Sequence, residues 1–305
     1  MKKYALIKYI LVVVLSVVIC DIGISYLYEA LMMNRYTEQF YRTYTASSNI
    51  AIMGASRASH HYVPDIIKDR LSLTAINYGI DGHNIYTQYA LLNSIVYHAP
   101  TKPEIVVLDV SSIDVYDSPK WNTEKLSILY PYYRSEGYVR NILCDLLEPT
   151  ELLAVQCFGL YRHNSKYIQY TKYLITGFPD YFDGYKPLNG EWNKPIEDEE
   201  ENLKVISNKK LEYFEKFIAL CEKEKIKLIF AVSPNYVKFS SHEWANKVAA
   251  IAKENKIPLL YHENDTVYYT HPEWFNEPFH LNDKGARFYT EEFCDELKVL
   301  IDKKV

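Results

Sequence analysis

The sequence lacks several patterns that would place it in a common functional class. Its five cysteines include no Cys-x-x-Cys pair and no His-rich spacing, so a zinc site is not indicated. It contains neither a Gly-x-Gly-x-x-Gly fingerprint nor a Gly-Lys-Ser/Thr phosphate loop, which disfavours a nucleotide-binding domain. The formal net charge of -5 leaves no basic stripe, so nucleic acid is not an expected partner. Cys144 and Cys157 are the two thiols that could pair in an extracytoplasmic protein, and free thiols are the alternative.

The N-terminus carries a long apolar segment. Three lysines stand among the first eight residues, and residues 9–20 are then continuously apolar apart from one serine. After Asp21 the apolar character resumes through residues 22–28, which gives enough length to cross a bilayer. Leading lysines favour a cytoplasmic N-terminus. We therefore expect a single-pass signal anchor with the body outside the membrane, periplasmic or at the cell surface. A cleaved signal peptide is the alternative, although no small-x-small cleavage site follows.

Beyond the anchor, the pattern predicts an α/β fold. Residues 1–48 are assigned to the cytoplasmic N-terminus, the transmembrane helix and a stalk, and residues 49–305 to one enzyme-like domain. Near-continuous apolar runs predict five parallel strands at Asn49–Gly54, Leu73–Tyr78, Glu104–Val110, Lys227–Val232 and Ile257–Tyr261. Helical patterns lie between most of these strands. This alternation predicts a three-layer sandwich around a five-stranded, flavodoxin-like sheet, with the working loops at the carboxyl ends of the strands.

The alternation stops in the middle of the chain. Residues 115–201 hold many of the 29 tyrosines and are too long for a bare loop, so they predict a mostly helical insertion between strands three and four. The tyrosines there fit half-buried packing or a sugar-facing surface. The acidic run 197–201 is expected to be a solvated approach to a helix. Further on, Ser240 and Glu243 resemble a helix capping box.

Two distant segments supply the parts of a serine nucleophile. Ser56 follows Gly54 at the end of the first predicted strand, where a glycine permits a tight turn. Glu277 stands three residues before His280, close enough for its carboxylate to bind the imidazole Nδ1 and leave Nε2 for the serine. A serine hydroxyl becomes a useful nucleophile when such a base takes its proton and a carboxylate orients that base. Taken singly, the serine fits an ordinary turn and the histidine a helix cap.

An oxyanion also needs hydrogen-bond donors. The second predicted strand ends in a turn that contains Gly82, and the backbone N–H groups of Ser56 and Gly82 are our candidate pair. Asp81 and Asn84 beside it are candidate substrate contacts. A simple strand-to-helix turn would have the same sequence.

In their order, these segments resemble the SGNH/GDSL hydrolase superfamily. Gly54-Ala55-Ser56 resembles the first block of that superfamily, Gly-Asp-Ser. Gly82 resembles the glycine of its second block. Glu277-Pro278-Phe279-His280 resembles its last block, Asp-x-x-His. The resemblance spans about residues 49–301, interrupted by the insertion. The third block departs from the pattern, because Leu108-Asp109-Val110-Ser111-Ser112 has no Gly-x-Asn-Asp. Ser111 or Ser112 is then the candidate third donor, and the alternative is that the site has none. The loss of one donor can cost about 3 kcal/mol of transition-state stabilisation.

The resemblance implies a serine esterase or O-acyltransferase. Tethered forms of this superfamily act on O-acyl groups of cell-surface polysaccharides, some beside a membrane-bound O-acyltransferase, so an acylated glycan is the expected substrate. The expected chemistry uses Ser56, His280 and Glu277 and needs no metal or cofactor. The alternative is a non-catalytic, membrane-tethered accessory protein that partners such an acyltransferase, which the missing third-block asparagine favours.

Overall fold

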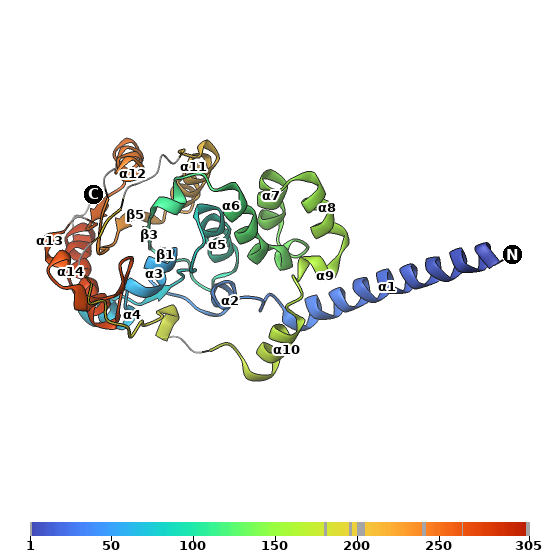
Figure 1. Ribbon diagram of the computed structural model, residues 1–305. Coiled ribbons are helices and arrows are strands. Elements are labelled where there is room, and N and C mark those ends of the chain that lie inside the picture. The colour runs from blue at the N-terminus through green and yellow to red at the C-terminus, as the bar shows by residue number, and fades with distance from the viewer. Residues whose placement is uncertain are drawn as a thin grey trace. The chain divides into compact units, whose positions relative to one another are not determined.

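The computed structural model describes residues 2–179, 182–194, 197–199, 205–239, 242–263 and 265–302. The chain forms two compact units (Figure 1). The first, which we call the helical unit, comprises residues 1–41 and 120–179. The second, the sheet unit, comprises residues 42–119 and 180–305. The sequence predicted one boundary, between the anchor with its stalk (residues 1–48) and the rest of the chain. The two units of the structure are instead defined by which residues pack together.

A five-stranded parallel sheet with the order β2-β1-β3-β5-β7 forms the centre of the sheet unit. Counted along the chain, this is the flavodoxin-like order 2-1-3-4-5. Its strands are β1 (Ile50–Gly54), β2 (Ala75–Asn77), β3 (Ile105–Asp109), β5 (Lys227–Val232) and β7 (Leu259–Tyr261). Every residue of β1 and β3 is buried, as expected for strands covered on both faces. The predicted sheet is confirmed.

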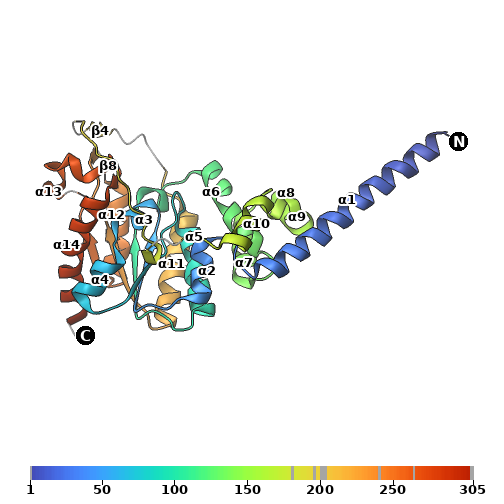
Figure 2. The same cartoon turned by 90° about the horizontal axis from the view of Figure 1, so that it is seen from below.

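Helices cover both faces of this sheet. The helices α3 (Ser56–His61), α4 (Pro64–Leu71) and α14 (Asp283–Asp302) pack together on one face, and α5 (Ile85–His98) and α11 (Asn208–Lys223) pack together on the other (Figure 2). Buried apolar residues of β1, β3 and β5 pack with those of α14, including Tyr289 and Phe293, to form the core. The predicted three-layer arrangement is therefore confirmed.

Short elements complete the sheet unit. They are η1 (Ser112–Asp114), η3 (Phe182–Gly184), α12 (Glu243–Glu254), α13 (Thr266–Tyr269), η4 (Pro272–Trp274), a parallel ribbon of β4 (Glu197–Glu199) and β6 (Val237–Phe239), and an antiparallel hairpin of β8 (Phe275–Glu277) and β9 (His280–Leu281). Residues 197–199 of the acidic run thus form a strand rather than a helix approach, because β6 offers them a partner. Residues 200 and 201 lie outside the described residues, as does Ser240 of the expected capping box.

The helical unit contains the N-terminal helix and most of the insertion. Its helices are α1 (Lys2–Met32), α6 (Pro119–Leu126), η2 (Ser127–Tyr132), α7 (Gly137–Leu146), α8 (Pro149–Cys157), α9 (Gly159–Arg162) and α10 (Tyr167–Thr176), and α2 (Glu38–Thr45) joins it to the sheet unit. The prediction of a mostly helical insertion is confirmed. Residues Tyr4–Met32 of α1 are long and apolar enough to cross a membrane.

Tyrosine rings build much of the interior of the helical unit. The ring of Tyr36 meets the rings of Tyr132 and Tyr170 edge-on, at centroid distances of 5.3 and 5.2 Å. All three side chains are buried. These tyrosines therefore act as packing residues. Cys144 and Cys157 are exposed free thiols in this unit.

Candidate active site

Ser56 lies at the carboxyl end of β1, where the strand turns into α3. Gly54 has a φ of +145°, and a Cβ at this position would lie 2.5 Å from the backbone oxygen of Asp109. Only glycine fits this approach without strain. The buried side chain of Gln88 binds both sides of the same residue: Gly54 N–H donates to Gln88 Oε1 at 3.2 Å, and Gln88 Nε2 donates to Gly54 O at 2.7 Å. The turn that presents Ser56 is thus fixed from two directions.

The candidate base, His280, and the candidate acid, Glu277, share the β8–β9 hairpin. His280 Nδ1 is hydrogen-bonded to Glu277 Oε1, and Glu277 Oε2 accepts the Phe279 N–H at 3.1 Å. Burial alone would raise the pKa of Glu277, but the hydrogen bond and charge of His280 and the Phe279 N–H hold that pKa below its ordinary value of 4.5. The carboxylate is therefore ionised at neutral pH, and it keeps the imidazole proton on Nδ1.

Ser56 and His280 meet across a separation of more than two hundred residues. Ser56 Oγ lies 2.6 Å from His280 Nε2. Because Nδ1 donates to Glu277, Nε2 is the acceptor and the Ser56 hydroxyl is the donor. The structure thus brings all three predicted residues into one hydrogen-bonded chain, the geometry that lets a histidine take a proton from a serine.

Two further histidines, which the sequence did not single out, support this chain. Buried His61 accepts the Leu281 N–H at Nε2 (2.9 Å), so its Nδ1 carries the proton and donates to Ser233 Oγ at 2.9 Å. Burial and then the neighbouring His280 and Arg57 lower the pKa of His61 well below 6.5, which keeps the ring neutral. Since Leu281 follows His280 directly, His61 fixes the strand that carries the base.

His60 also lies beside His280, the candidate base. Its Nδ1 binds the Lys186 carbonyl at 2.6 Å, and its ring centroid is 5.5 Å from that of His280. Burial lowers the pKa of His60 below 6.5. Its Nε2 lies 3.4 Å from a carboxylate oxygen of Asp81, the exposed residue predicted to contact substrate.

A cavity of about 300 Å³ opens beside the Ser56 hydroxyl. Apolar side chains on its wall are Ile113, Trp244 and Phe279, and polar ones include Ser111, Ser112 and Asn235. The third-block candidates differ in their bonding, because Ser111 gives both its N–H (2.9 Å) and its hydroxyl (3.1 Å) to Asp114. Burial raises the pKa of Asp114 to about 6. Both donors of Ser111 are therefore engaged within the fold, and the oxyanion role of Ser112 stays a prediction.

The second-block residues lie in the turn after β2. This turn joins the end of β1 through Ile80 N–H, which donates to Gly54 O at 3.0 Å. Gly82 has a φ of +69°, which suits glycine, and lies outside the wall of the cavity beside Ser56. Asn84 is 2% exposed and caps α5, accepting the Tyr86 N–H at 3.1 Å. Its side chain is thus engaged in the fold, while the oxyanion role of Gly82 stays a prediction.

A buried ion cluster borders the cavity, whose wall includes Arg57 and Glu263. Arg57, next to the serine, lies 3.8 Å from Asp109 and 3.7 Å from Glu263. Its guanidinium also donates to the carbonyls of Val110 (2.9 Å) and Ser233 (3.2 Å), at the ends of β3 and β5. Arg57 therefore ties three strand ends together. Its position after Ser56 was visible in the sequence, but no sequence signal marked its buried carboxylate partners.

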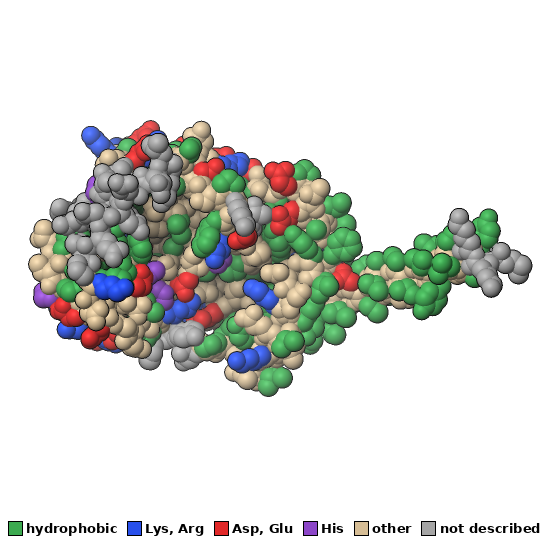
Figure 3. Space-filling view, in the orientation of Figure 1, with side chains coloured by type: hydrophobic (Ala, Val, Ile, Leu, Met, Phe, Trp, Pro, Cys, Tyr) green, Lys and Arg blue, Asp and Glu red, His purple; other side chains and the backbone are tan. Residues whose placement is uncertain are grey.

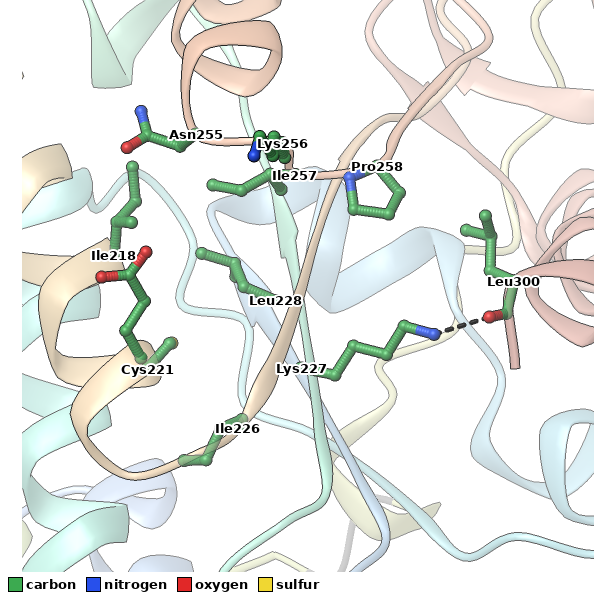
Figure 4. A pocket seen from close by; sticks show the side chains of 11 residues that line it. Ile218, Cys221, Ile226, Lys227, Leu228, Asn255, Lys256, Ile257, Pro258 and Leu300 are labelled. Carbon is green, nitrogen blue, oxygen red and sulfur yellow. Dashed lines mark hydrogen bonds between the residues drawn. The ribbon is translucent and has the colours of Figure 1, made fainter. Parts of the chain in front are cut away.

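A second cavity lies at the opposite, amino-terminal edge of the sheet. Figure 4 shows its wall, formed by the end of α11, the start of β5, residues 255–258 before β7 and the last turn of α14, with Lys227 Nζ donating to Leu300 O. Burial raises the pKa of the Cys221 thiol there to about 12, so this cysteine is inert as a nucleophile. Across the described ranges, no group of three or more His, Cys, Asp or Glu residues is arranged to hold a metal ion.

Several solved structures are similar to this chain. A candidate lipolytic protein of the G-D-S-L family from Desulfitobacterium hafniense is 11% identical, with a TM-score of 0.41, and the match covers 81% of this chain and 97% of that one. A candidate acylhydrolase from Bacteroides fragilis is 13% identical, with a TM-score of 0.39, over 88% of this chain and 97% of that one. No protein-family model and no curated protein matches the chain.

The fold and the order of its site segments agree with the resemblance noted from the sequence. Ser56 follows the first sheet strand, Gly82 the second, and Glu277 and His280 precede the last helix.

Proposed function

We propose that this protein is a serine ester hydrolase or O-acyltransferase that acts on acylated glycans at the cell surface. The observation that carries the proposal is the 2.6 Å contact between Ser56 Oγ and His280 Nε2, with the opposite ring nitrogen held by Glu277. Catalytic chains of this composition activate a serine on several unrelated folds.

The proposed chemistry has two steps, acylation of Ser56 and then deacylation. Ser56 Oγ attacks the acyl carbonyl carbon while His280 Nε2 takes the hydroxyl proton, and the resulting imidazolium is stabilised by Glu277. Collapse of the tetrahedral intermediate breaks the ester bond, and His280 returns the proton to the departing sugar oxygen. Water or a second sugar hydroxyl then attacks the acyl-serine by the same route. The Ser56 and Gly82 N–H groups, with Ser112, are our candidates for binding the oxyanion.

The cavity supports a small acyl group. Its volume of about 300 Å³ is at the lower end of ligand sites, and Ile113, Trp244 and Phe279 offer it apolar contact. Phe279 is 37% exposed, so this wall borders solvent where a bulky alcohol such as a glycan could remain outside. The apolar helix α1 supports a tethered, outward-facing enzyme, because three lysines stand in its first two turns.

The test is hydrolysis of p-nitrophenyl acetate by the full-length protein and by Ser56→Ala. We expect the substitution to lower kcat/KM by at least about a thousand-fold. The control is Ser59→Ala, which changes a buried serine one turn further along α3. Equal rates for Ser56→Ala and the unmodified protein would reject the mechanism. Adding a sugar acceptor and following acyl transfer separates transferase from hydrolase activity.

A second candidate is a non-catalytic accessory protein beside a membrane-bound O-acyltransferase. The observation that favours it is the commitment of both Ser111 donors to Asp114, which weakens the third oxyanion position. A fluorophosphonate probe discriminates between the two, because an activated serine is labelled at Ser56. Absence of labelling in the folded protein, with co-purification of a membrane-bound acyltransferase, would favour the accessory role.

A further inference from the structure

A groove of about 500 Å³ lies within the helical unit, where the insertion meets the apolar N-terminal helix. Its wall includes Val17, Val18 and Asp21 of α1, and Phe158, Leu160 and Tyr161 at the start of α9. Figure 3 shows apolar side chains continuing from the projecting helix onto the adjoining surface. Three residues of the candidate membrane span therefore form part of a groove whose other wall the insertion supplies.

Asp21 fixes the insertion to this helix. Its carboxylate accepts the N–H groups of Gly159 at 2.7 Å and Leu160 at 2.6 Å, at the beginning of α9. Gly159 allows the close approach, since a Cβ there would lie 2.4 Å from the Ser25 Cβ. A carboxylate that accepts two N–H bonds is far less costly to remove from water than an isolated one. The charge inside the apolar segment thus has a structural purpose, as a cap for α9.

The depth of the groove follows from helix geometry. A helix rises about 1.5 Å per residue, so a hydrocarbon core of about 30 Å is crossed in about 20 residues. Counted from Tyr4, the first residue of the candidate span, the core would end near Gly23, and counted from Tyr9, after the last of the leading lysines, it would end near Tyr28. On either count Val17 and Val18 lie inside the hydrocarbon, and the groove beside them reaches its outer half.

The insertion exposes large apolar side chains at this level. Phe158 is 51% exposed and Leu160 is 54% exposed. Full burial of one such side chain is worth about 1.5–3 kcal/mol, so water is an unfavourable neighbour for this surface. Because the candidate membrane span forms part of the wall of this groove, most soluble partners are excluded from it.

We propose that this groove holds acyl chains of lipids in the outer leaflet, and that the helical unit is seated on the bilayer rather than only tethered by α1. The proposal depends on α1 crossing the membrane and is independent of the esterase chemistry. Seating brings the whole helical unit, and not only the span, into contact with the membrane surface.

The test uses the full-length chain in phosphatidylcholine vesicles with a fluorophore on Leu160→Cys. The exposed cysteines are first changed to serine, namely Cys20, Cys144 and Cys157. Vesicles carry a nitroxide near the top of the lipid acyl chain. We expect quenching at position 160 at least about three-fold stronger than at the matched control, Val299→Cys, which is 53% exposed in the sheet unit. Equal quenching at both positions overturns the proposal. Phe158→Cys provides a second probe if Leu160→Cys unfolds.

A second arm identifies the occupant in the native membrane. A benzophenone amino acid at position 160 is photoactivated in cells that make the full-length protein. A lipid adduct on the purified chain supports the proposal. A cross-link to a second protein at this position would show instead that the groove is a protein interface, and it would overturn the assignment to lipid.

Discussion

Replacement of His61 by phenylalanine tests whether the buried ring next to the site positions the catalytic base. The phenyl ring keeps most of the volume of the imidazole but removes the acceptor of the Leu281 N–H and the donor to Ser233. Leu281 is fully buried, so its N–H has no water to replace the lost bond. An unsatisfied buried donor costs about 1–3 kcal/mol. We expect the free energy of unfolding to fall by this amount.

The same substitution should also slow the reaction. Leu281 is the next residue after His280, so relaxation of this strand end moves Nε2 away from the 2.6 Å contact with Ser56. A loss of alignment worth about 1.4 kcal/mol lowers kcat by about ten-fold. His61→Gln retains an acceptor at a similar reach and should recover most of that loss. The assays are ester hydrolysis, the rate of fluorophosphonate labelling and urea unfolding.

Tyr62→Phe is the matched control. It removes a buried hydroxyl on the neighbouring residue, which donates to Asp109 Oδ2 at 2.5 Å, without touching the Leu281 N–H. We expect it to lower stability but to leave kcat within about two-fold of the unmodified protein. If His61→Phe loses stability yet keeps the same kcat as Tyr62→Phe, the positioning role of His61 is refuted and the residue is merely structural.

Three further predictions follow from the site. Glu277→Gln should lower kcat about a thousand-fold, because it loses the charge that holds the Nδ1 proton of His280. The control Glu273→Gln, which changes a carboxyl bonded to His271, should leave kcat unchanged. Similar kcat values for the two variants would contradict the triad. Gly54→Ala should lower the free energy of unfolding by about 2 kcal/mol or more in urea, because its Cβ would meet the Asp109 carbonyl at a φ of +145°. Gly137→Ala, with nothing within 4 Å, should show no such loss. The contribution of His61 to stability should fall as the pH drops below 6.5, by up to about 1.4 kcal/mol per pH unit, since the unfolded chain protonates His61 whereas the folded chain holds its pKa well below 6.5. Burial also lowers the pKa values of His60 and His163, so urea midpoints from pH 7 to 5 should show a flatter slope in His61→Phe without removing it.

The sequence predicted the sheet well because each strand is a separate apolar run. Residues 50–54 and 105–109 are buried on both faces of the sheet, and their sequences do not alternate between apolar and polar residues. The strand ends and the i−3 spacing of Glu277 and His280 were likewise local patterns. The hydrogen-bonded contact of His280 with Ser56 is an observation that the structure adds to these patterns.

The supporting residues could not be predicted because their partners are distant in the chain. Gln88 reads as one polar residue on a helix, and only the packed fold places its amide against Gly54. The burial of Arg57 depends on Glu263, more than two hundred residues away. Asn84 was considered for substrate binding, yet its side chain caps α5, a role that depends on where the helix begins. The strand at 197–199 required a partner that local charge did not reveal.

The β8–β9 hairpin has a consequence for how the proposed activity would be lost. Glu277 and His280 are joined by one short turn, which Tyr236 N–H holds through the Pro278 carbonyl at 2.6 Å. A rigid displacement of the hairpin would leave the imidazole tautomer intact and alter only its spacing from the serine. Substitutions far from the site should therefore slow proton transfer from Ser56 to His280 by varying amounts. The shape of the pH–rate profile should stay unchanged.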